Sequence, residues 1–251
     1  MGIEFVDPHT GVLYDDPSAL AAFYIVLADV QLEEPLPASV YRDQVAVYLD
    51  NFFLMIPLRD SKGPEENMMF FWRVGFVLPA DAPKPPKAPT LEYLQHMMDT
   101  RNPWDTKITI SSVSTSTRYR VRSAVASSYF QKLGDGNILL AGDAAHVHSP
   151  VGGQGMNLGM CDAVAAAHAI QSHLQAKDPD QSSDALRHYA ESRRKIGVRV
   201  VGFTRGLTTI INTSTGWKRV VRNIVLRVVS YLPFVNRRLA WRISGLANRD
   251  P

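Results

Sequence analysis

The sequence predicts a mixed α/β fold, and three observations carry this prediction. Before Leu91, apolar and aromatic residues occur in short alternating runs that are typical of antiparallel strands. The apolar run 137–141 is followed by a glycine-rich stretch and a helical pattern, which together indicate a strand, a turn and a helix. After Asp184, the spacing of apolar residues is helical almost to the end of the chain.

The first part of the chain is expected to form an antiparallel sheet. Strands are predicted over 44–49, 52–57 and 68–78, with the polar stretch 59–67 between the last two. Phenylalanine and tryptophan residues of these runs suit either the core of the sheet or the wall of a pocket for a planar substrate: Phe52, Phe53, Phe70, Phe71, Trp72 and Phe76. The sequence leaves both interpretations open.

The next elements are a connection, a helix and a long strand. Five prolines between residues 78 and 90 predict an extended surface segment. A helix is predicted over 91–99. The alternating residues 107–123, rich in Thr, Val and Ser, predict a long strand that returns the chain to a second domain.

The most informative segment runs from Gly142 to Asn157. It follows the run 137–141, which we expect to be a buried strand entered through a turn at 134–136. Asp143 then lies at the carboxyl end of that strand, where open α/β sheets bind ligands. After Pro150 come three glycines in four positions, and a helix is expected to begin near Gly155 with its first N–H groups directed at a ligand.

This order of residues resembles the second FAD-binding motif of the flavin-dependent aromatic hydroxylases, the group A monooxygenases related to para-hydroxybenzoate hydroxylase. Its parts are GDAAH, a proline, a glycine-rich stretch with Asn, and a closing Asp-Ala pair, here 162–163. Weaker similarity extends to residues 25–30, 56–58 and 189–194. By this resemblance, Asp143 would bind the ribityl or ribose hydroxyls of FAD and Pro150 would lie beside the isoalloxazine. The remaining residues implied to bind the cofactor line its pyrimidine side: Gly152, Gly153, Gly155, Met156 and Asn157.

The resemblance also implies parts that these residues do not contain. No GxGxxG turn for the ADP half of FAD occurs in the sequence. The Asp-Gly motif, which family members carry in the middle of the chain, is also missing, and residues 1–5 resemble the segment that follows it. The expected fold is therefore the C-terminal part of a FAD/NAD(P)-binding Rossmann-like fold plus a β-sheet substrate domain. The expected division is a β-rich substrate domain over 1–110, the rest of the FAD-binding domain over 111–185, and basic helices over 186–251. A complementing N-terminal polypeptide is one expected partner.

The charge is distributed unevenly. Residues 187–251 hold 14 Lys and Arg against two acidic residues, a net +12, whereas the preceding residues carry −9. Residues 219–232 predict an amphipathic helix with a basic side, to which Arg219 and Arg222 belong, and an apolar valine-rich side. We expect the apolar side to pack on the flavin domain, with peripheral membrane contact as the alternative. No apolar run is long enough to span a bilayer.

Other features restrict the remaining classes. A single cysteine, Cys161, excludes an intrachain disulfide, and without a secretory signal pattern the expected location is intracellular, in the cytoplasm. His146 and His148 lack a third ligand nearby, so no metal is expected. Ser149, His146 and Asp143 crowd one loop without a GxSxG elbow, which disfavours a hydrolase. No nucleic-acid motif accompanies the basic C-terminal region, so no nucleic-acid partner is expected.

The function implied by the resemblance is that of a FAD-dependent monooxygenase. NAD(P)H would reduce FAD, and one oxygen atom of O2 would hydroxylate or epoxidise a small aromatic or polycyclic substrate. The expected biological role is in secondary-metabolite biosynthesis. No catalytic side chain is assigned, because the flavin carries the chemistry. Tyr119, Arg120 and Arg122 are candidates for a position near the flavin, or are exposed strand residues. The alternative function is a non-redox relative that acts as a binding or scaffold protein, or one half of a split enzyme.

Overall fold

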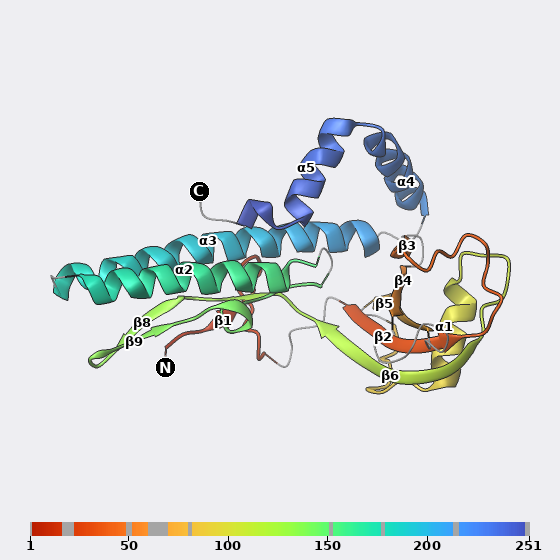
Figure 1. Ribbon diagram of the computed structural model, residues 1–251, viewed down its shortest axis with the longest axis horizontal. Helices are drawn as coiled ribbons and strands as arrows, with labels where there is room; N and C mark the ends of the chain where they lie inside the picture. Colours follow the sequence, from red (N-terminus) through yellow and green to blue (C-terminus); the bar gives the residue numbers. More distant parts are fainter. Residues whose placement is uncertain are drawn as a thin grey trace. The chain divides into compact units, whose positions relative to one another are not determined.

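The computed structural model describes residues 2–16, 23–48, 52–59, 70–79, 82–150, 153–176, 179–212 and 216–248. It is a mixed α/β protein that divides into two compact units (Figure 1). The first unit comprises Met1–Leu20, Arg122–Ile210 and Val220–Pro251, and the second comprises Ala21–Val121 and Ile211–Arg219. The functional assignment of the three predicted segments stays a prediction.

The second unit is built on a five-stranded antiparallel sheet in the order β3-β4-β5-β2-β6. Its strands are β2 (Phe23–Leu32), β3 (Ala46–Tyr48), β4 (Phe53–Arg59), β5 (Phe70–Pro79) and β6 (Ile110–Val121). The three strands predicted at 44–49, 52–57 and 68–78 are thereby confirmed as antiparallel neighbours. The strand predicted over 107–123 is confirmed with shorter bounds.

One helix, α1 (Leu91–Arg101), packs on this sheet and confirms the helix predicted at 91–99. It begins after Thr90, whose hydroxyl accepts a hydrogen bond from the N–H of Tyr93 at 3.3 Å. Its buried side chains join a core to which the strands contribute three of the predicted aromatics: Phe53, Trp72 and Phe76. For these three residues the core interpretation is confirmed, and the rings of Phe53 and Phe76 stack with centroids 5.5 Å apart.

The first unit combines small antiparallel sheets with long helices. The strands are β1 (Phe5–Val6), β7 (Ala124–Ala126) and β10 (His146–Val147) in one sheet, and β8 (Phe130–Leu133) and β9 (Gly136–Leu139) in a hairpin. The helices are α2 (Gly155–Gln175), α3 (Pro179–Asn212), α4 (Gly216–Ser230) and α5 (Pro233–Ile243), with 3-10 turns η2 (Gly142–Ala144) and η3 (Leu246–Asn248). Helices α2 and α3 lie side by side along the β8–β9 hairpin, and their apolar faces share a core with it (Figure 1).

The strand predicted over 137–141 is present as β9, but it is not buried as expected. In the structure β9 ends at Leu139, its first residues are exposed and its last are half-buried. Its neighbour in the described part of the chain is β8, with which it pairs antiparallel. A central strand is buried because neighbours and covering layers lie on both sides, whereas β9 has one such strand among the described residues. The start of α2 at Gly155 is as predicted.

The amphipathic helix predicted at 219–232 is present as α4, but its apolar side is not packed as expected. Val220, Val221, Ile224, Val225 and Val228 are each about half exposed. The buried residue of this helix is instead Arg222, whose guanidinium bonds to the Asn223 side chain and to the carbonyl of Ile210. Membrane contact through this region stays a prediction. No helix in the described part of the chain is long and apolar enough to cross a membrane.

Candidate flavin-binding site

The first half of the motif lies at the end of the β8–β9 hairpin. Asp143 is in the 3-10 turn η2 and its side chain is exposed. The turn starts at Gly142, which has φ +60°, and a Cβ built on Gly159 of α2 would lie 3.4 Å from its Cα. Glycine at both positions therefore lets the turn approach the helix closely, and Asp143 projects from a point that the helix holds in place.

The second half of the motif is the start of α2. Gly153 has φ +62°, and a Cβ added there would meet no heavy atom within 4 Å. A Cβ on Gly155 would meet only the ring of His148, at 3.8 Å. Pro150 and Met156 are exposed and Asn157 is half-buried, while Gly152 lies outside the described residues. Open space therefore lies where side chains would otherwise stand.

This arrangement fits the flavin part of FAD in three respects. The backbone N–H groups in the first turn of α2 have no carbonyl partner within the helix, and the positive end of the helix dipole favours an anionic or electron-rich ring edge. The open positions at Gly153 and Gly155 admit a flat ring close to the backbone. Asp143 is exposed, and its carboxylate can accept hydrogen bonds from sugar hydroxyls.

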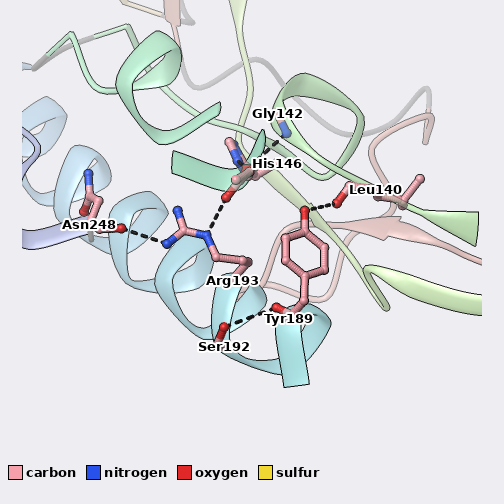
Figure 2. A network of polar contacts seen from close by, with 8 residues as sticks. Leu140, Gly142, His146, Tyr189, Ser192, Arg193 and Asn248 are labelled. Atoms are coloured by element: carbon pink, nitrogen blue, oxygen red, sulfur yellow. Dashed lines mark hydrogen bonds and ion pairs between the residues drawn. The ribbon is translucent and has the colours of Figure 1, made fainter. Parts of the chain in front are cut away.

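The two halves are joined by a buried carboxylate, Asp162 of α2. Its side chain is 0% exposed and accepts three hydrogen bonds: from the Gly142 N–H at 3.0 Å, from Nε2 of His146 at 2.7 Å and from Nε of Arg193 at 2.7 Å. The guanidinium of Arg193 is also 0% exposed and donates to the backbone carbonyl of Asn248 at 2.8 Å. Figure 2 shows Arg193 reaching between these partners from α3.

The electrostatics of this network follow from burial and pairing. Burial alone would raise the pKa of Asp162, but the hydrogen bonds from His146, Arg193 and the Gly142 N–H outweigh it, so the pKa lies below its usual value. Burial lowers the pKa of His148, whose Nδ1 donates a hydrogen bond to the Ser149 carbonyl at 2.9 Å. Asp162 is therefore held as a carboxylate at neutral pH.

The other chemistries weighed from the sequence involve these same histidines. His146 pairs with Asp162 rather than with Asp143, and the hydroxyl of Ser149 accepts a hydrogen bond from Thr208 at 3.1 Å. Within the described ranges, no group of three His, Cys, Asp or Glu side chains is placed to hold a metal ion.

The sequence did not identify Arg193 or Asn248 as parts of this site, and it used Asp162 only as a motif marker. A signal for Arg193 exists, because it falls at helical spacing on the apolar face of α3 together with Tyr189, Ile196 and Val200, all buried. A charged residue on such a face requires a buried partner. Asn248 carries no comparable signal.

The three candidates at the end of β6 have structural surroundings of their own. Tyr119 is 52% exposed and Arg120 is exposed. Arg122 lies over the ring of Tyr14, at 5.4 Å from its centroid, and donates to the Tyr14 carbonyl. This contact joins two segments of the first unit, the N-terminal segment and the chain that follows β6.

An open cavity of about 490 Å³ lies against α2. Its wall comes from α2, from Arg193 and from the turn after α5, and the residues of α2 include Met160, Cys161, Val164 and His168. Cys161 is half-buried.

Comparison with known proteins identifies the family to which these features belong. Residues 37–204, about two thirds of the chain, match the protein family described as FAD binding domain. The chain belongs to the FAD-dependent aromatic hydroxylase family. The cofactor of this family is FAD.

The matched relatives are longer than this chain. It is 34% identical over 134 residues to the 12-dehydrotetracycline 5-monooxygenase/anhydrotetracycline 6-monooxygenase of Streptomyces rimosus, a match over 53% of this chain and 26% of that protein. Among solved structures, OxyS anhydrotetracycline hydroxylase from Streptomyces rimosus matches with a TM-score of 0.62 and 26% identity, over 92% of this chain and 42% of that one. The Diels-Alderase PyrE3 of pyrroindomycin biosynthesis shares the fold, with a TM-score of 0.65 and 23% identity over 99% of this chain and 46% of that one.

Proposed function

We propose that this chain is part of a FAD-dependent monooxygenase that hydroxylates or epoxidises a small aromatic or polycyclic substrate with NAD(P)H and O2, in secondary-metabolite biosynthesis. The observation that carries the proposal is the joint placement of the exposed Asp143 and the open start of α2, held together by Asp162. The tetracycline substrates named for two similar proteins support the substrate class. An intracellular location, in the cytoplasm, belongs to the same proposal.

The residues of this chain would bind and orient the cofactor. FAD, when bound, would supply redox chemistry in which NAD(P)H is the electron donor, one oxygen atom of O2 enters the substrate and the other leaves as water. Asp143 would accept hydrogen bonds from sugar hydroxyls of FAD, and Pro150 would lie beside the ring. Gly152, Gly153, Gly155, Met156 and Asn157 would line its pyrimidine side, where the free N–H groups of α2 favour negative charge.

The ADP half of FAD requires a further structural unit. Rossmann-like folds bind it at a GxGxxG turn before a helix, and the proposal assigns this role to a polypeptide segment that packs on α2. Support comes from the exposed apolar face of α2, formed by Met156, Met160, Val164, Ile170 and Leu174, each at least 44% exposed. A continuous apolar face of this kind is typical of a surface that a partner covers.

A non-redox binding or scaffold protein is the second candidate. The fold is shared with a protein described as a Diels-Alderase, so this fold carries more than one named function. We therefore retain the non-redox function as a candidate. The two candidates differ in one measurable property, which is flavin retention.

The test replaces Gly155 by Val and measures retained flavin after gel filtration in the presence of FAD. The Cβ and methyl groups would fill the open space at the start of α2, so we expect loss of flavin retention. The matched control is Gly206→Val in α3, where an added Cβ meets nothing within 4 Å. Equal flavin retention in wild type and Gly155→Val would contradict the assigned site. A folded wild type that retains no flavin, even with a GxGxxG-containing partner segment supplied, would favour the second candidate.

A further inference from the structure

The start of α2 is tied to the end of α5 by one buried amide. Gln154, the residue before α2, is 1% exposed. Its Nε2 donates to the carbonyls of Arg242, at 3.1 Å, and Ile243. The last carbonyls of a helix have no partner within it. The side chain of Gln154 therefore caps α5 while its backbone begins α2, and the position of one end depends on the other.

Asn248 closes the same connection from η3. It is 4% exposed, and its Nδ2 donates to Oε1 of Gln154 at 2.7 Å. Its carbonyl accepts from Arg193 at 2.8 Å (Figure 2). Arg193 in turn holds Asp162, which accepts the N–H of Gly142. Asn248 thus contacts both halves of the flavin motif, one through Gln154 and the other through Arg193 and Asp162.

The turn between α5 and η3 also packs directly on α2. Gly245 has φ +78° and is buried, and a Cβ built there would lie 3.3 Å from Cβ of Asn157. The N–H of Asn248 donates back to the carbonyl of Gly245 at 2.9 Å. The turn is therefore a compact structure seated on the first turn of the helix.

We propose that residues 245–248, here called the C-terminal latch, position the flavin-binding backbone of α2. The latch holds Gln154, and through it the backbone of residues 153–158, in the conformation that leaves the first N–H groups of the helix open to the flavin. Asn248 and Gln154 are positioning residues that do not touch the cofactor. This inference rests on the proposed function, and its first consequence is a structural one that exists without flavin.

The removal of the Asn248 amide tests the latch. Asn248→Ala removes the buried hydrogen bond from Nδ2 of Asn248 to Oε1 of Gln154, and the loss of a buried hydrogen bond favours rearrangement of the segment that it held. We expect backbone amide hydrogen exchange at 153–158 to become about tenfold faster, with unchanged exchange in β2 and β6. Flavin affinity should fall by about tenfold, the equivalent of one hydrogen bond. The matched control is Asn236→Ala, whose side chain is exposed and donates to the Ser230 carbonyl.

The outcomes separate the latch from the proposed function. Faster exchange confined to 153–158 supports the latch even when the wild type retains no flavin with a GxGxxG-containing segment supplied. That absence of flavin counts against the proposed function and not against the latch. Unchanged exchange at 153–158 overturns the latch, and so does an equal increase throughout the first unit, which indicates a purely structural role. If Asn248→Ala does not fold, Asn248→Asp gives the same test at constant size, because a carboxylate oxygen then faces Oε1 of Gln154.

Discussion

The buried carboxylate of Asp162 offers the sharpest test of how the motif is held together. We consider Asp162→Asn, which keeps the volume of the side chain but removes its charge. The guanidinium of Arg193 then stays fully buried without its counter-charge, and the Gly142 N–H loses a charged acceptor. The removal of one partner of a buried ion pair typically costs about 3–5 kcal/mol in free energy of unfolding. We expect about 3 kcal/mol, because Asn retains one acceptor oxygen.

Urea unfolding followed by circular dichroism measures this loss as a shift of the transition midpoint. The control is Asp184→Asn, which removes an exposed pair with Arg187 whose N–O distance is 3.4 Å and should cost less than about 1 kcal/mol. A loss below about 1 kcal/mol in Asp162→Asn would refute the claim that this carboxylate joins α2, α3 and the Gly142 turn.

The pH dependence of this difference has a definite sign. The pKa of Asp162 in the folded chain lies below its unfolded value of about 3.9, since hydrogen bonds to the carboxylate outweigh its burial. Its contribution to stability is therefore fully present above about pH 4 and is lost as the pH falls through the folded pKa. The stability difference between wild type and Asp162→Asn should be constant near neutrality and should narrow in acid.

Two further variants test local packing and titration. Gly197→Ala should destabilise the chain by about 1–3 kcal/mol, because its Cβ would lie 2.5 Å from the hydroxyl of the buried Tyr129. Urea unfolding should show a smaller loss when Gly197→Ala is introduced into Tyr129→Phe. The control Gly206→Ala should show no loss of stability. Equal losses in both backgrounds would rule out this contact. Burial lowers the pKa of His148 below its usual value of about 6.5. The contribution of His148 to stability is therefore fully present above about pH 6.5 and is lost as the pH falls through the folded pKa. His148→Gln should reduce the fall of the unfolding temperature in acid, and an unchanged fall would contradict this assignment.

Local patterns predicted most of the elements that position the site. The alternating runs predicted the strands of the sheet, and the spacing from Pro150 to Asn157 predicted the start of α2 at Gly155. These features depend on neighbours in sequence, through strand periodicity, glycine conformation and the helix start. The placement of the motif beside α2 follows from the same local order.

Long-range contacts account for what the sequence did not predict. Asp162, Arg193 and Asn248 meet across separations of 31 and 55 residues, which no local pattern encodes. The prediction that residues 137–141 form a buried strand was wrong, because an apolar run indicates a strand without specifying its neighbours. The apolar side of α4 was expected to be covered, but helical periodicity identifies a face without showing what packs on it.

Flavin binding at Asp143 and the start of α2 is tested by the absorbance spectrum of the purified chain between about 350 and 500 nm, recorded after incubation with FAD and gel filtration. We expect a retained flavin spectrum, with the chain alone or with a GxGxxG-containing segment supplied, and its loss in Gly155→Val but not in Gly206→Val. A folded, monodisperse protein with no flavin absorbance under both conditions would contradict the assignment of α2 and Asp143 to flavin binding.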